Sequence, residues 1–154
     1  MARPPLRNDW FHRAPDVGGM QRFEAFFAGH GYEMHRHDTY AIGHTLAGVQ
    51  SFQYRGSWRH SQPGSTMVLH PDEAHDGEAG TEEGFKYRML YVEPALIQQM
   101  LGQLSEINLL RRDEEGEWLL ARDLEDLTLC DLYEACQLRV PVAVAPLPFP
   151  DDAL

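Results

Sequence analysis

Short stretches of β-branched and aromatic residues, separated by glycines, recur throughout residues 21–95 and restrict the chain to few folds. The candidate strands are Arg22–Ala28, Tyr32–His37, Tyr40–Leu46, Gln50–Tyr54, Thr66–His70 and Phe85–Val92. Strands this short and this regularly spaced are typical of a closed or sandwiched β architecture of the jelly-roll type. The sequence therefore predicts a mainly β protein built around a barrel.

Three histidines mark the candidate interior of this barrel. His35 and His37 lie two residues apart, and residues at i and i+2 of a strand share a face, so both imidazoles can point into one cavity. His75 follows near the end of the β region, and closure of the barrel could bring it beside the other two. The sequence thus predicts a polar interior lined by histidine.

Side-chain size along two strands extends the predicted lining. In residues 40–46 the even positions are large and the odd ones small, so we expect the even face, with Tyr40 and His44, to point inward. In residues 87–92 the odd positions Tyr87, Met89 and Tyr91 form one face. Aromatic rings with a polar tip suit a pocket that orients a polar ligand, although the same residues could be plain barrel core.

Composition divides the chain into four parts. Pro94 suits the first turn of a helix, and the apolar spacing that follows predicts one helix there and a second from about Glu117. The four parts are an extended N-terminal arm (residues 1–20), the barrel (21–95), a helical segment (96–136) and a Pro-rich acidic tail (137–154).

Charge and cysteine content narrow the classes of function. The net charge is −11, of which residues 106–154 carry −8, and no cluster of basic residues exists that could neutralise phosphates. We therefore expect no direct binding of nucleic acid by this chain. Cys130 and Cys136 lie six apart in a predicted helix, the N-terminus lacks a secretory signal, and no run of eighteen apolar residues occurs. These features predict a cytoplasmic protein with no membrane contact.

The histidines allow a metal site as an alternative to a plain pocket wall. His35, His37 and His75 resemble the ligand set of cupin barrels, in which His-x-His is followed by a glutamate. Here Ala41, Ile42 and Gly43 occupy the places where that glutamate could fall. The missing carboxylate favours hydrogen-bonding pocket walls and no cofactor, while a divalent transition metal on three imidazoles remains the alternative.

Several motifs together resemble the sensor and dimerisation domain of AraC-type transcriptional regulators. They are residues 35–43, Gly56 after Tyr54-Arg55, Pro63-Gly64, residues 70–77 and residues 87–94, and they span about half of the chain. The resemblance implies a cupin-like jelly-roll barrel that binds a small effector, followed by C-terminal α-helices that pair two subunits. Such regulators normally continue into two helix-turn-helix units, a pattern that the Pro-rich stretch after residue 136 lacks.

These observations favour a small-molecule sensor of a transcriptional regulator, which is not an enzyme. We expect a sugar-like or aromatic metabolite to contact His35, His37, Tyr40, His44, His75, Tyr87, Met89 and Tyr91. The helical segment would form a homodimer through its leucines, unless these pack on their own barrel. One alternative is a metal-dependent cupin enzyme, an oxygenase or isomerase, that uses the histidine cluster. A bare dimerisation module with a packed barrel is a third class.

Overall fold

A computed structural model describes residues 8–135 of the chain, which fall into two compact units. Within the described residues, the first unit comprises residues 8–94 and the second residues 95–135. The predicted Pro-rich tail, residues 137–154, lies outside the described residues.

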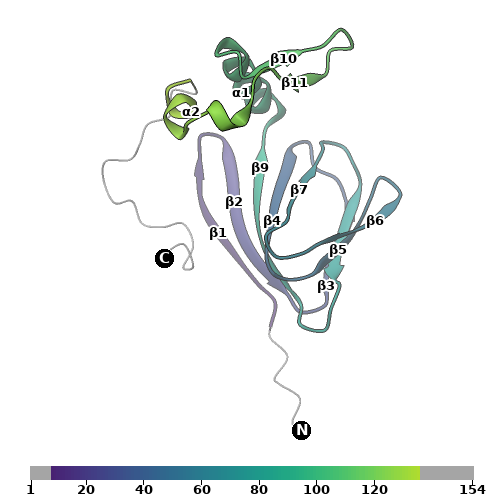
Figure 1. Cartoon of the computed structure of the whole chain (residues 1–154). Coiled ribbons are helices and arrows are strands. Elements are labelled where there is room, and N and C mark those ends of the chain that lie inside the picture. The colour runs from purple at the N-terminus through teal and green to yellow at the C-terminus, as the bar shows by residue number, and fades with distance from the viewer. Residues whose placement is uncertain (1–7, 136–154) are drawn as a thin grey trace. The chain divides into compact units, whose positions relative to one another are not determined.

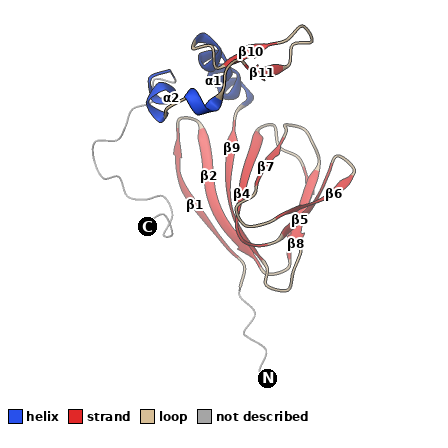
Figure 2. Cartoon of the chain, in the orientation of Figure 1, coloured by secondary structure: helices blue, strands red, loops and turns tan. Residues whose placement is uncertain are grey.

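The first unit consists of two antiparallel β-sheets (Figure 1). The five-stranded sheet has the order β1 (Trp10–Val17), β2 (Met20–Phe27), β9 (Phe85–Val92), β4 (Tyr40–Gly48) and β7 (Thr66–Leu69). The four-stranded sheet has the order β3 (His30–His35), β8 (His75–Ala79), β5 (Gln50–Tyr54) and β6 (Ser57–Ser61). Strands far outweigh helices in the described chain (Figure 2), which confirms the predicted mainly β, cupin-like jelly-roll fold.

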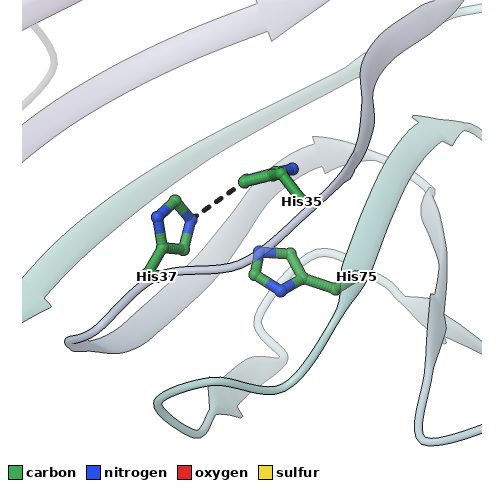
Figure 3. Close-up of side chains that lie close together, drawn as sticks. All are labelled: His35, His37 and His75. Carbon is green, nitrogen blue, oxygen red and sulfur yellow. Dashed lines mark hydrogen bonds between the residues drawn. The ribbon is translucent and has the colours of Figure 1, made fainter.

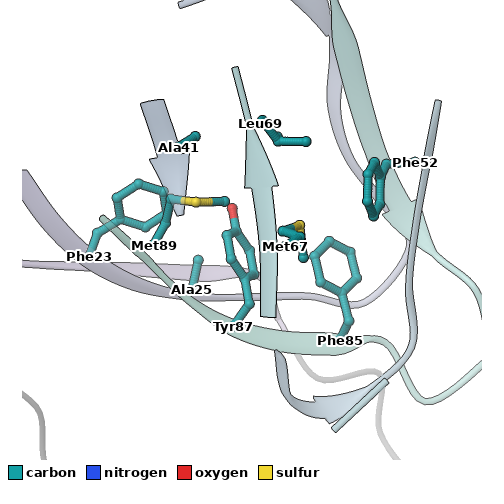
Figure 4. Close-up of a cluster of buried hydrophobic side chains, with 9 residues drawn as sticks. All are labelled: Phe23, Ala25, Ala41, Phe52, Met67, Leu69, Phe85, Tyr87 and Met89. Atoms are coloured by element: carbon teal, nitrogen blue, oxygen red, sulfur yellow. The ribbon is translucent and has the colours of Figure 1, made fainter. Parts of the chain in front are cut away.

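Aromatic and sulfur-containing side chains fill the core of this unit (Figure 4). Along β9 the buried positions alternate, because successive side chains of a strand point to opposite faces. Phe85 and Tyr87 stack with ring centroids 5.5 Å apart, and Phe23 meets Tyr87 edge-on at 5.8 Å. The core residues are Phe23, Ala25, Ala41, Phe52, Met67, Leu69, Phe85, Tyr87 and Met89.

Strand β4 presents the opposite face to the one that its sequence predicts. Ala41, Gly43 and Thr45 face the core, whereas His44 on the other face is exposed. The small residues are needed here because Met67 and Met89 fill the space opposite. A Cβ atom on Gly43 would lie only 3.0 Å from side-chain carbons of both methionines.

Three strands of the first unit have no counterpart in the sequence prediction. Strand β1 forms within the predicted N-terminal arm and pairs with β2, so residues 10–17 belong to the sheet. Its Pro15 is compatible with this position because β1 is an edge strand. Strands β6 and β8 are short and polar, and their pairing with β5 forms them despite weak β propensity.

The second unit contains one long helix and a β-hairpin. Helix α1 (Pro94–Glu106) begins at the predicted proline. The second helix predicted from Glu117 is wrong, because residues 118–120 form strand β11, which pairs with β10 (Leu110–Arg112). Gly116, with φ of 88°, allows the tight turn between these strands. A short 3-10 helix (Leu124–Asp126) and helix α2 (Leu129–Ala135) follow.

Candidate functional site

The three predicted histidines converge at one end of the four-stranded sheet (Figure 3). His35 ends β3 and His75 begins β8, and the two residues lie directly opposite each other in the antiparallel pair. His37 follows in the loop after β3. One ring nitrogen from each residue lies within 4.8 Å of the others. The structure thus brings together side chains that are 40 residues apart in the sequence.

Backbone carbonyls fix the orientation of two of these rings. His35 Nδ1 donates to the carbonyl oxygen of Glu33 over 2.7 Å, and His75 Nδ1 donates to that of Glu73 over 3.0 Å. In the neutral ring, the proton on Nδ1 leaves Nε2 as an acceptor. His37 Nε2 lies 3.0 Å from His35 Nε2 and donates to it. With this pairing, His75 Nε2 and His37 Nδ1 carry the lone pairs that a ligand can use.

The surroundings keep His37 and His75 neutral near pH 7. Burial, followed by electrostatic repulsion from the neighbouring His35 and His75 rings, lowers the pKa of His37 to about 4. Burial also lowers the pKa of His75, against the opposing effect of its hydrogen bond to the Glu73 carbonyl. Neutral imidazole is the form that binds metals and can both donate and accept hydrogen bonds. His37 and His75 therefore offer a ligand neutral imidazole nitrogens and carry no positive charge near pH 7.

Two tyrosines form an aromatic wall around the histidines. The Tyr91 ring lies 4.6 Å from the His37 ring, and the Tyr32 ring meets His35 edge-on at 5.2 Å. Burial raises the pKa of Tyr91 to about 12, so its hydroxyl keeps its proton. Tyr32, which was absent from the predicted site, faces the histidines because the register of β3 shifts between residues 32 and 35. Simple strand parity could not reveal this irregularity.

A buried glutamine extends the polar network behind Tyr32. Gln50 is fully buried, and its Nε2 donates to the Tyr32 hydroxyl over 2.7 Å. Its Oε1 has no hydrogen-bond partner among the described residues. A buried acceptor without a partner costs about 1–3 kcal/mol, so a donor from a bound molecule would be stabilising here.

The other predicted site residues are not part of the histidine cluster. Tyr87 and Met89 belong to the packed core, where burial, followed by the nearby Tyr32 and Tyr91, raises the pKa of Tyr87. Tyr40 packs against His70 at 5.2 Å, and His44 is exposed and hydrogen-bonds to Thr66 over 3.1 Å. The inward orientation predicted for Tyr40 and His44 is therefore wrong, since β4 turns its small residues to the core.

The jelly-roll of two sheets is a cupin-like fold. A family model described as "AraC-like ligand binding domain" matches residues 17–135. The chain belongs to this family, as its sequence motifs predict.

Solved structures support the fold. A cupin superfamily protein from Desulfitobacterium hafniense aligns with a TM-score of 0.51 at 10% identity, covering 60% of this chain and 84% of that one. The cupin domain of an XRE family transcriptional regulator from Enterobacter cloacae aligns with a TM-score of 0.50 at 13% identity. The alignment covers 57% of this chain and 99% of that one. A cupin barrel protein from Salinispora arenicola has a TM-score of 0.50 at 20% identity and covers 64% and 93%.

Curated relatives correct the predicted location. A protein of Stenotrophomonas maltophilia and one of Xanthomonas axonopodis, both named UPF0761 membrane proteins, are 57% and 56% identical over 70 residues, which is 43% of this chain. The matched part spans only 16–17% of the length of these relatives. Their name contradicts the expected cytoplasmic location. In the described part of the chain no helix is long and apolar enough to cross a bilayer.

Proposed function

We propose that this chain is the sensor domain of a transcriptional regulator and binds a small polar metabolite at His35, His37 and His75. The observation that carries the proposal is the convergence of three imidazoles, two of them oriented by backbone carbonyls, in a domain of the AraC-like ligand-binding family. The domain acts in this proposal as a binding module and not as an enzyme.

The chemistry of the site suits a ligand that offers hydroxyl groups and a flat apolar face. Neutral imidazoles exchange hydrogen bonds with hydroxyls, and the Tyr91 ring beside His37 offers a stacking surface. Gln50 Oε1, deeper behind Tyr32, would accept from a further hydroxyl or from a bridging water. Sugars, polyols and hydroxylated aromatic compounds meet these requirements.

The response to this ligand would be a change in the pairing of two chains. A ligand shifts an equilibrium only by its differential affinity for the two states, and coupling of ~1–3 kcal/mol gives a several-fold response. Apolar residues of the second unit suit such pairing, since Met100, Leu120 and Leu124 are exposed by 38%, 54% and 52%. Given the net charge of −11, contact with DNA would be made by a different polypeptide segment.

A thermal-shift screen with sugars, polyols and aromatic acids tests the effector site. We expect at least one compound to raise the unfolding temperature of the wild-type chain, because a ligand that binds only the folded state stabilises it. The His37→Asn variant should lose this shift, and the matched His44→Asn variant should keep it, since His44 lies on the outer face of β4. An equal shift in His37→Asn would contradict the assignment.

A divalent transition metal is a second candidate for this centre. The carbonyl-bound Nδ1 atoms of His35 and His75 resemble the outer hydrogen bonds that orient metal-binding histidines. Three imidazoles bound to a tetrahedral metal would leave its fourth position open for a ligand atom. The alternative of a metal-dependent cupin enzyme also requires such an open position. Titration with Co²⁺ should then give the intense visible bands of a tetrahedral site, which His75→Asn abolishes. Absence of these bands would leave the hydrogen-bonding pocket as the better description.

A further inference from the structure

A groove of about 290 Å³ lies at the free edges of the two sheets and contains none of the three site histidines. Strand β6 is the edge of the four-stranded sheet and β7 is the edge of the five-stranded sheet (Figure 1). Its lining includes Phe52 of β5, Arg59 of β6, Ser65 before β7, and Met67, Val68 and Leu69 of β7. Two open sheet edges thus leave access to part of the core.

The floor of the groove is apolar. Phe52, Met67 and Leu69 are inward residues of β5 and β7, and all three are buried in the core cluster. Val68 is 47% exposed and also lines the groove. A ligand that enters here would therefore contact carbon and sulfur atoms with its body. Binding sites for small molecules commonly combine such a surface with a few polar groups.

A positively charged side chain, Arg59, lines the groove beside this apolar floor. Arg59 is directly opposite Phe52 in the β5–β6 register, so both side chains project from the same face of the sheet. Within residues 8–135, Arg59 makes no hydrogen bond or ion pair, whereas Arg55 is paired with Glu73. The chain contains 24 acidic residues, yet none of them lines the groove. This local charge favours an anion in spite of the negative net charge.

We propose that the groove is a second binding site, which takes a small monocarboxylate with an apolar body. The carboxylate would form a two-pronged pair with the Arg59 guanidinium, and the Ser65 hydroxyl could donate to it. The apolar body would lie on Phe52, Met67 and Leu69. A volume near 290 Å³ is at the lower limit for such sites and so restricts the ligand to a small molecule. The site is independent of the effector proposed for the histidine centre.

Calorimetric titration of the full chain with benzoate and hexanoate tests the groove. We expect at least one of these probes to bind, and benzamide, which has the shape of benzoate without its charge, to bind more weakly than benzoate. Arg59→Gln should weaken binding of the carboxylate at least tenfold, with Arg59→Lys in between. Arg111→Gln, which removes an exposed arginine of β10, is the matched control and should bind as wild type.

The location of binding is read from amide shifts in ¹H–¹⁵N spectra. Addition of the carboxylate should shift the amide signals of β6 and β7. The His37→Asn variant should bind the carboxylate with the same affinity as the wild-type chain. The proposal is overturned if neither carboxylate binds, if Arg59→Gln binds as well as wild type while remaining folded, or if the shifted amides surround His35 and His75. Because His37→Asn affects only the histidine centre, failure of one site leaves the evidence for the other intact.

Discussion

His37 shows most clearly how its surroundings determine the properties of a single residue. Its ring lies between His35, His75 and Tyr91, and burial together with the neighbouring imidazoles lowers its pKa to about 4. The ring is therefore neutral in the folded chain at pH values where an exposed histidine already carries a proton. This difference between the folded and unfolded states makes stability depend on pH.

Stability should fall as the pH is lowered from about 6.5 to about 4. In this window the unfolded chain binds a proton at His37 that the folded chain does not, so the free energy of unfolding decreases with decreasing pH. His37→Asn should reduce this loss by on the order of 1 kcal/mol, allowing for solvent screening. Urea unfolding at several pH values measures this loss of stability, and the His44→Asn variant, at an exposed histidine, is the control. An unchanged pH slope in His37→Asn would contradict the stated pKa.

A buried carboxylate supports the sheet at a second position that the sequence did not single out. Glu24 is 2% exposed and bonds to Lys86 over 3.0 Å and to Arg88 over 2.8 Å. Glu24→Gln should lower the free energy of unfolding by about 1–3 kcal/mol, because it removes hydrogen bonds between charged groups in a buried environment. Glu33→Gln, at an exposed hydrogen bond with His30, should change the free energy of unfolding by less than about 1 kcal/mol. Equal effects of the two variants would argue against this explanation.

At the scale of elements, strands that alternate in composition could be predicted and irregular ones could not. The bounds of β5 and β9 agree with the sequence prediction, because Gly48 and Gly56 delimit β5, and Gly84 and Pro94 delimit β9. Strand β8 contains Asp76, Gly77 and Glu78, which do not favour a strand, and it forms through its partners β3 and β5. Which face of β4 points to the core depends on the side chains that pack against it, Met67 and Met89. The sequence of β4 itself does not contain this information.

The contact between β3 and β8 gives the prediction for this scale. Gly77 lies opposite Tyr32, and a Cβ atom at this position would overlap the Tyr32 ring. Gly77→Ala should therefore displace Tyr32 from His35, lower stability by roughly 1–3 kcal/mol and weaken effector binding. Gly29→Ala is the control, because a Cβ atom there meets nothing within 4 Å. Unchanged stability and binding in Gly77→Ala would show that Tyr32 does not position the histidines.

At the scale of the whole molecule, the family could be predicted from the sequence and the location could not. The motifs at residues 35–43 and 70–77 fall within the segment that the AraC-like ligand binding domain model matches. Location depends on more than this chain, since the relatives named membrane proteins contain the matched part as only 16–17% of their length. The net charge and the apolar runs of this sequence describe only these residues, so they do not determine where the protein is located.

The proposed pairing of two chains is tested by sedimentation velocity. We expect a mass of twice the 17.6 kDa of one chain, reduced by Leu120→Asp or Leu124→Asp, because a charge in an apolar interface is unfavourable. Val17→Asp, at an exposed position of β1 outside the helical segment, should leave the mass unchanged. A mass of one chain at all concentrations would exclude the homodimer.

The central claim is that His35, His37 and His75 act as one ligand-binding centre, and imidazole ¹H–¹⁵N spectra at pH 7 test it most directly. We predict the Nδ1-protonated form for His35 and His75, and a joint shift of all three rings on addition of a metabolite identified by the thermal screen, with His44 unmoved. Nε2-protonated rings at both residues, or a bound metabolite that shifts none of the three, would contradict the account.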